Sequence, residues 1–259
     1  MFTKEQIESF KGKIIAFEGL DNSFKETNYN AFVSRLREDF ELKSSLSKIE
    51  VKGMISSSIE IPNIITESFP RYGNQSALMV EKWLDGSLDR NHMKKNAFAT
   101  CSLYAMDRLS FWYESVHGLP TNITRLRDSV FVFDRYSSSN AIYNPMGFDD
   151  NASISDLLLD STVFGNPSPN IVVWMRMKNF DTLASLIAKK QNKDANELDL
   201  SFIFSAWKRS EKAIADGIFD KAGIKLIVIE CLDDNLNIRS REELSNEIYK
   251  KITQEVIKL

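Results

Sequence analysis

The sequence predicts an α/β protein in which helices cover both faces of a parallel sheet. Short apolar runs rich in β-branched and aromatic residues lie at 13–17, 129–134, 170–177 and 224–230. Nearly continuous runs of this kind are typical of strands that are buried on both faces. A fifth strand is expected at residues 64–70, and strand–helix alternation favours a doubly wound sheet.

The amphipathic stretches between these runs predict helices at residues 27–40, 75–88, 96–117, 179–190, 200–217 and 239–257. The polar segment 43–63 contains few strong helix formers, so we expect a surface excursion or a small hairpin there. Because no repeat or low-complexity tract interrupts the chain, residues 1–259 are expected to form a single domain.

The composition limits the kinds of partner that we expect this protein to bind. A formal net charge of −3 supplies no overall attraction for nucleic acid or an anionic membrane. The start of the chain lacks the apolar region of a secretory signal, and no apolar run is long enough to span a bilayer. We therefore expect a cytoplasmic protein with no nucleic-acid or membrane partner. Cys101 and Cys231 have no disulfide or zinc spacing and are expected to be buried thiols.

The stretch AFEGLDNSFKETN, residues 16–28, has the frame of a phosphate-binding loop after the first strand. Gly19 and Lys25 have the spacing of the glycine and lysine in GxxxxGK[ST], where backbone N–H groups surround phosphate oxygens and the lysine neutralises them. However, Phe24 occupies the second glycine position, and Glu26 replaces the hydroxyl that ligates Mg²⁺. Taken alone, the stretch is equally compatible with a turn and a helix cap.

Two further strand ends carry polar chemistry, and ligands gather at this edge of a parallel sheet. Arg71, in FPRY, is suited to grip an anion with paired hydrogen bonds, although a lone arginine more often forms a surface salt bridge. Asp134 and Arg135 begin DRYSSSNAIY after another strand. At this strand end the carboxylate could hold a metal ion and the guanidinium could bind a transferring phosphate. The alternative interpretation is that the two residues form a buried ion pair.

Together, FEGLDNSFKET, FPRY, LYAMDR and DRYSSSNAIY resemble the thymidylate kinases in order and approximate spacing. The resemblance covers residues 13 to about 215. It implies the fold of the P-loop nucleoside monophosphate kinases, with a five-stranded parallel sheet. It also implies a reaction in which ATP, with Mg²⁺ as cofactor, phosphorylates dTMP or a close relative such as dUMP. The longer segment at 43–63 and the FKET loop look more like phage-type members of the family.

The resemblance implies a role for each matching residue on the acceptor side. Asp21 would contact the sugar 3′-hydroxyl close to the reacting phosphate, Arg71 would bind the acceptor monophosphate, and Arg135 would act near the transferring phosphate. Tyr104 would stack on the base and Arg108 would hydrogen-bond it, since the two residues share one helix face. Ser139 and Asn140 would read the base edge, and Tyr143 would exclude a 2′-hydroxyl. Asp21, Lys25 and Arg135 are thus the expected catalytic residues.

On the donor side, the resemblance assigns Gly19, Ser23, Lys25 and Thr27 to ATP. A basic segment at 188–199 resembles a mobile lid that brings Lys189, Lys190 and Lys193 over the phosphates, although such a run is more often a solvated surface. Asn22, Phe24 and Glu26 stand where the family has Gly, Gly and Thr. A metal ion held between Glu26 and Asp134 would keep the loop working.

Two alternatives remain open at the level of sequence. The chain is either a working kinase or a deoxynucleotide-binding or nucleotide-hydrolysing homologue that has lost phosphoryl transfer through its altered loop. The resemblance also implies a homodimer, with the helix around residues 109–116 as the candidate surface, although Trp112 and Tyr113 equally suit the core.

Overall fold

The computed structural model describes residues 3–50, 63–89, 96–117, 127–146, 150–191, 193–194 and 196–259. Within these ranges five strands form one sheet in the order β2-β3-β1-β4-β5, and all neighbouring strands are parallel. This confirms the predicted five-stranded parallel sheet. The strands are β1 (Ile14–Gly19), β2 (Asn63–Ser68), β3 (Ser129–Asp134), β4 (Ile171–Arg176) and β5 (Lys225–Glu230).

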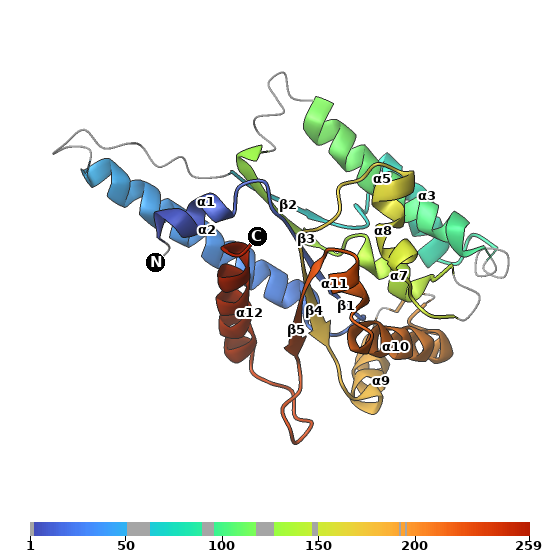
Figure 1. Ribbon diagram of the computed structural model, residues 1–259. Helices are drawn as coiled ribbons and strands as arrows, with labels where there is room; N and C mark the ends of the chain where they lie inside the picture. Colours follow the sequence, from blue (N-terminus) through green and yellow to red (C-terminus); the bar gives the residue numbers. More distant parts are fainter. Residues whose placement is uncertain are drawn as a thin grey trace.

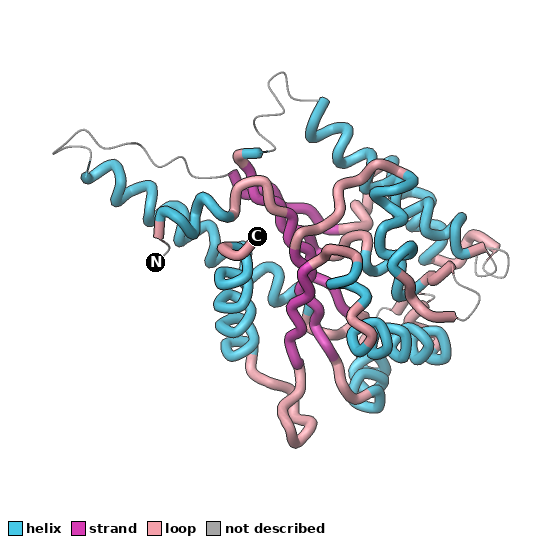
Figure 2. Tube along the Cα trace, in the orientation of Figure 1, coloured by secondary structure: helices cyan, strands magenta, loops and turns pink. Residues whose placement is uncertain are grey.

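Helices cover both faces of the sheet (Figure 1). On one face lie α1 (Lys4–Ser9), α2 (Lys25–Glu50) and α12 (Arg241–Val256). The other face carries α5 (Ala97–His117), α7 (Ser138–Tyr143), α8 (Ile154–Val163), α10 (Leu200–Ala215) and α11 (Ile218–Lys221). The remaining short elements are η1 (Gln75–Ala77), α3 (Leu78–Leu84) and α9 (Phe180–Lys189). Figure 2 shows the strands as one central layer between the helices.

The expected excursion at 43–63 is wrong in its first part. Helix α2 continues through residues 43–50, and residues 51–62 lie outside the described residues. Serine carries only a modest helix penalty, and once a helix has formed each added residue is easier to order than a new nucleus. The preceding helix, and not the local composition, therefore decides the structure of residues 43–50.

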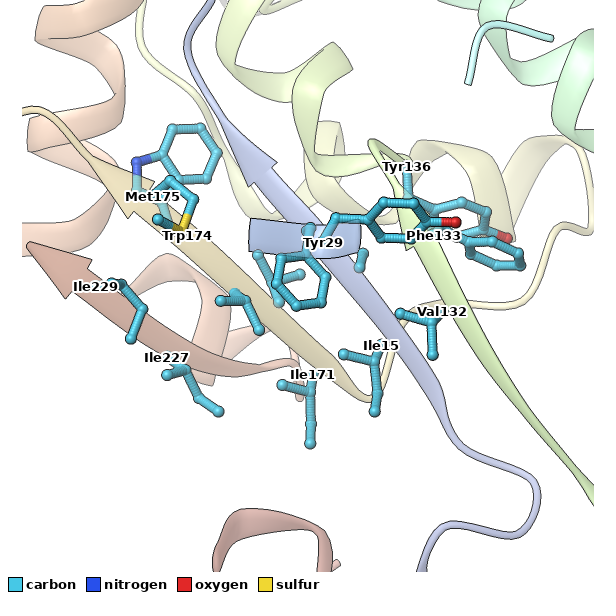
Figure 3. Close-up of a cluster of buried hydrophobic side chains, with 14 of the residues drawn as sticks. Ile15, Tyr29, Val132, Phe133, Tyr136, Ile171, Trp174, Met175, Ile227 and Ile229 are labelled. Atoms are coloured by element: carbon cyan, nitrogen blue, oxygen red, sulfur yellow. The ribbon is translucent and has the colours of Figure 1, made fainter. Parts of the chain in front are cut away.

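Side chains from the sheet form the centre of the core. Ile15, Val132, Ile171 and Ile227, from four neighbouring strands, are at most 4% exposed. Figure 3 shows these four side chains in a row across the sheet. This burial explains why the strands read as continuous apolar runs. Both cysteines are buried free thiols, as expected. No helix in the described ranges combines the length and apolar character needed to cross a membrane.

The strand order places the site. β1 lies between β3 and β4, so the chain leaves β1 at the point where the strand order switches direction, which is where ligands bind in open α/β sheets. The register pairs Phe17 with Asp134, so the ends of β1 and β3 lie side by side. The phosphate-loop stretch and the DRY segment therefore meet at one edge of the sheet.

Candidate functional site

The loop between β1 and α2 has left-handed backbone at two of the altered positions. The φ angle is 62° at Asn22 and 61° at Phe24. Asparagine tolerates this region, whereas for phenylalanine it costs roughly 1–2 kcal/mol. A Cβ at Gly19 would lie 2.6 Å from Ser23 Oγ and 2.8 Å from the Met175 carbonyl oxygen, so the close approach requires glycine. The loop thus has backbone suited to glycine even where glycine is absent.

This loop forms one wall of a cavity with an empty volume of about 1250 Å³, here called the loop cavity. It is lined by residues 20–27 together with Ser68, Phe69, Pro70, Tyr72, Asp134, Arg135, Leu186 and Lys190. Helix α2 begins at Lys25, and the N–H groups of a first helical turn have no helical partner, which favours anion binding. Ser23 Oγ is buried and has no hydrogen-bond partner among the described residues. The cavity therefore offers donors to an anionic ligand.

Lys25 and Asp134 form an ion pair on the wall of the loop cavity. Lys25 Nζ lies 3.3 Å from Asp134 Oδ1, and both side chains are largely buried. Burial and the Arg135 guanidinium lower the pKa of Lys25, while Asp134 and Asp21 oppose the shift. The lysine charge is thus held in a desolvated setting, where its attraction to a phosphate is stronger than in water.

A second cavity, here called the aromatic cavity, shares several wall residues with the first. Tyr104 and Arg108 line it from α5, which confirms that the two share one helix face. Ser139, Asn140 and Tyr143 line it from α7, and Asn140 Nδ2 donates to the Cys101 carbonyl (3.3 Å). The structure thus brings together the five residues that were assigned to the base and sugar of the acceptor.

Asp21 and Arg135 line both cavities. Arg135 Nη2 donates to the Asp21 carboxylate, and Arg135 Nη1 lies 3.4 Å from the Gly19 carbonyl oxygen. Tyr143 Oη donates to Asp21 Oδ2 (3.1 Å) and accepts from the Asp21 N–H (3.2 Å). Although burial alone would raise the pKa of Asp21, the nearby Arg135 and Lys25 cations lower it below its ordinary value. Asp21 is therefore an ionised acceptor at the boundary between the two cavities.

Glu18, which was not among the predicted site residues, supports this boundary. Its carboxylate is fully buried and accepts hydrogen bonds from the N–H groups of Tyr136 (3.0 Å) and Ser139 (3.2 Å) and from the Ser139 hydroxyl. Burial raises the pKa of Glu18, and these hydrogen bonds oppose the rise. The only signal in the sequence was an acidic residue at the end of an otherwise apolar strand.

Arg108 is held by a partner that was also missed. Asp160, on α8, accepts from Arg108 Nε and Nη2, and the latter distance is 3.0 Å. Both side chains are almost fully buried. The pair fixes one edge of the guanidinium while Arg108 still lines the aromatic cavity. The short helix α8 was not predicted, so its acidic residue had no assigned place.

Arg71 differs from its expected role, because it lines neither of the two cavities. Its guanidinium is bound by Asp107 (Nε–Oδ1, 3.1 Å), Glu114 (Nη1–Oε2, 2.8 Å) and Ser76 (Nη2–Oγ, 2.9 Å). Its side chain is only 4% exposed. The arginine has turned toward α5, where carboxylates balance its charge, so in this structure it clamps helices together and faces no acceptor phosphate.

The lid segment, residues 188–199, divides its polar residues between the two cavities. Lys190 lines the loop cavity, whereas Asp194 and Asn196 line the aromatic cavity. The Lys193 ammonium donates to the Ala188 carbonyl (3.0 Å) and Lys193 lines neither cavity, so its expected place over the phosphates stays a prediction. Lys189 is exposed and lines neither. Residues 192 and 195 lie outside the described residues.

The donor set for a metal ion is small. Glu26 is exposed at the loop cavity and Asp134 lies on its wall, but no group of three His, Cys, Asp or Glu side chains in the described ranges is arranged to hold a metal. Mg²⁺ in nucleotide sites commonly uses one or two carboxylates plus phosphates and water. The oxygen donors of Glu26, Asp134 and Ser23 fit that chemistry.

The fold class is that of the P-loop nucleoside monophosphate kinases, a five-stranded parallel sheet flanked by helices. No protein-family model matches the chain, and no curated protein matches it in sequence. Among solved structures, it is similar to thymidylate kinase from Ehrlichia chaffeensis, with 16% identity, a TM-score of 0.51 and coverage of 93% of this chain and 98% of that one. It is also similar to thymidylate kinase from Candida albicans, with 14% identity, a TM-score of 0.54 and coverage of 95% and 94%.

Proposed function

We propose that the protein is a nucleoside monophosphate kinase that transfers the γ-phosphoryl group of ATP to dTMP or a close pyrimidine deoxynucleotide such as dUMP. The observation that carries the proposal is that Asp21 and Arg135 line both cavities at once. A phosphoryl group that passes between two bound nucleotides must lie where their sites meet. Arg135 supplies positive charge at that point, and Asp21 supplies an acceptor for the sugar hydroxyl.

The loop cavity suits the triphosphate of the donor. Backbone N–H groups of the loop, Ser23 Oγ and the Lys25 ammonium converge there, and Thr27 and Lys190 complete the wall. Glu26 and Asp134 would hold Mg²⁺, which when bound neutralises charge on the phosphate oxygens. The left-handed backbone at Phe24 also supports this assignment, because costly backbone conformations are concentrated at functional sites.

The aromatic cavity suits a pyrimidine deoxynucleotide. Tyr104 offers a ring for stacking, and Arg108, fixed by Asp160, presents hydrogen-bond donors to acceptor atoms of the base. The hydrogen bonds between Tyr143 and Asp21 hold the tyrosine ring beside the expected sugar position, where it would exclude a 2′-hydroxyl. Ser139 and Asn140 add polar groups at the same wall.

Transfer in this site would depend on positioning and charge neutralisation. An oxygen of the acceptor monophosphate attacks the γ-phosphorus, and the bond from that phosphorus to the bridging oxygen breaks, leaving ADP with the electron pair. Arg135 and Lys25 balance the charge on the transferring group and the donor phosphates. None of these side chains needs to form a covalent bond.

The direct test is to incubate the purified protein with ATP, Mg²⁺ and dTMP and to separate the nucleotides by chromatography. We expect ADP and dTDP in equal amounts, with dUMP as a slower or comparable acceptor. Lys25→Ala should abolish turnover while dTMP binding is retained in calorimetry, because Lys25 lines only the loop cavity. Absence of any diphosphate with all common triphosphate donors would contradict the proposal.

One observation favours a second candidate, a protein that binds or hydrolyses a deoxynucleotide without phosphoryl transfer. The Glu26 carboxylate faces the loop cavity and would repel a triphosphate that arrives without metal. This alternative predicts calorimetric binding of dTMP, no binding of ATP with Mg²⁺, and no diphosphate product. Release of thymidine and phosphate would identify the hydrolytic form.

We also propose a homodimer through α5. Phe98, Met106 and Tyr113 are 48%, 52% and 66% exposed and are spaced about two turns apart, so they lie on one helix face. Trp112 belongs to the core, so the candidate surface is the face of α5 that carries these three residues and does not include all of residues 109–116. A Met106→Glu/Tyr113→Glu variant should elute as a monomer in light-scattering chromatography. An unchanged mass would count against this face.

A further inference from the structure

The lid and the phosphate loop are joined by one buried carboxylate, that of Glu197. Lys190 Nζ donates to both of its oxygens, at 2.7 Å and 2.8 Å. Asn22 Nδ2 of the phosphate loop lies 3.4 Å from Oε1, and the Asp194 N–H lies 3.1 Å from Oε2. The Glu197 side chain is 1% exposed, whereas Lys190 is 43% exposed. The carboxylate thus links the lid to the phosphate loop while being shielded from solvent.

Glu197 and its two side-chain partners lie at different positions relative to the loop cavity. Asn22 and Lys190 line the cavity, but Glu197 lines neither of the two cavities described. Glu197 therefore lies behind the two residues and would hold their polar groups at the wall. A ligand in the loop cavity would meet the Lys190 ammonium and the Asn22 amide first.

We propose that Glu197 is a positioning residue for the phosphate donor, which it serves by tying Lys190 of the lid to Asn22 of the phosphate loop. This inference rests on the proposed function and deepens it. A lysine on a flexible stem has many orientations in water, and a bidentate carboxylate removes most of them before the donor binds. Asn22, which stands where the family has glycine, gains a role that glycine lacks, because its amide gives the lid a partner on the loop.

A role for Glu197 in neutralising Lys190 would predict the opposite change in donor affinity when Glu197 is removed. If Glu197 mainly neutralised Lys190, its carboxylate would compete with the donor phosphates, and its removal would strengthen donor binding. The geometry points to positioning, because the Glu197 carboxylate also accepts from the Asp194 N–H and Glu197 is not among the residues that line the loop cavity.

The experiment compares Glu197→Ala and Glu197→Gln with the wild type. For Glu197→Ala we expect the KM for ATP and the calorimetric Kd for ATP with Mg²⁺ to rise about tenfold, as befits loss of hydrogen bonds to a charged group, with the KM for dTMP unchanged. Glu197→Gln keeps the acceptor oxygen and should recover part of the loss. Glu247→Gln is the matched control, because this carboxylate on α12 bridges Lys251 of the same helix and Arg239, which precedes it, and Glu247 lines neither cavity.

A double-mutant cycle shows whether Glu197 acts through Lys190. In a Lys190→Met background, Glu197→Ala should weaken donor binding by much less than it does in the wild type. Tighter ATP binding by either Glu197 variant, equal changes in the two KM values, or simple additivity with Lys190→Met would overturn the inference. Failure of the proposed function gives a different result, since the wild type itself would then form no diphosphate.

Discussion

Arg135 Nη2 donates to the carboxylate of Asp21, and the two residues line both the aromatic cavity and the loop cavity. Arg135 has a φ of 63°, an uncommon conformation for a residue with a side chain. The hydrogen bond from the Tyr136 N–H to buried Glu18 fixes the backbone directly after it. The orientation of the Arg135 guanidinium is thus set by tertiary hydrogen bonds and not by the intrinsic backbone preference of arginine.

Arg135→Lys should remove most of the activity without unfolding the protein. Lysine retains the charge but cannot reach Asp21, Gly19 and Ser139 with a planar fork, so we expect kcat to fall by about 10²–10³-fold. The measurement is ADP release with saturating ATP and dTMP. Arg176→Lys is the control, because Arg176 ends β4 at the same sheet edge, pairs with Glu211 and Glu230, and lines neither cavity. Equal rates in the two variants would rule out this role for Arg135.

The Glu26→Thr variant tests whether Glu26 is a metal ligand or a residue that impairs the phosphate loop. Because Glu26 is exposed and lines the loop cavity, we expect the fold to be unaffected and the Mg²⁺ concentration for half-maximal rate to rise about tenfold. In the absence of metal, ATP binding should tighten, because a carboxylate beside the phosphates has been removed. A Mg²⁺ titration of the initial rate gives the answer. Higher activity at every Mg²⁺ concentration would instead mean that Glu26 impairs the loop.

Arg71→Met tests the structural role that the arginine has in this fold. Asp107 is 1% exposed and would keep a buried charge without its partner, so we expect the free energy of unfolding to fall by about 3–5 kcal/mol. Glu114→Gln removes the other partner, which is 59% exposed, and should cost less than about 1 kcal/mol. Urea unfolding measures both values. A loss of dTMP affinity with unchanged stability would restore the phosphate-clamp interpretation of Arg71.

The sequence was sufficient for the sheet and for most of the site because both depend on simple patterns. β1, β3 and β4 are buried on both faces, so their apolar runs were unambiguous, and residues at parallel strand ends must share one edge. This reasoning placed Asp21, Lys25, Asp134 and Arg135 around a common cavity. Tyr104 and Arg108 were assigned through the family resemblance, and their helical spacing supported the assignment.

What the sequence did not reveal depends on pairing between distant segments. Nothing near Arg71 in the chain indicates that Asp107 and Glu114, about forty residues later, take up its donors. Asp160 lies on a helix too short to give a clear periodic signal, and Glu197 looked like a solvated residue of a polar run. Buried ion pairs of this kind are fixed by tertiary packing, which local patterns do not encode.

Glu18→Gln should change how stability depends on pH. Burial raises the pKa of Glu18 above its ordinary value of 4.5, so over the interval between the two values the folded protein holds more protons than the unfolded chain. Stability from this group is therefore present at low pH and is lost as the pH rises through that interval. Because glutamine does not titrate, the excess stability of the wild type over the variant should shrink as the pH rises above 4.5, as followed by urea unfolding. Asp21→Asn gives the opposite comparison, since the pKa of Asp21 is lowered and its contribution is lost only as the pH falls. A difference between wild type and Glu18→Gln that stays constant over the whole range would show that the buried carboxylate titrates alike in the folded and unfolded protein.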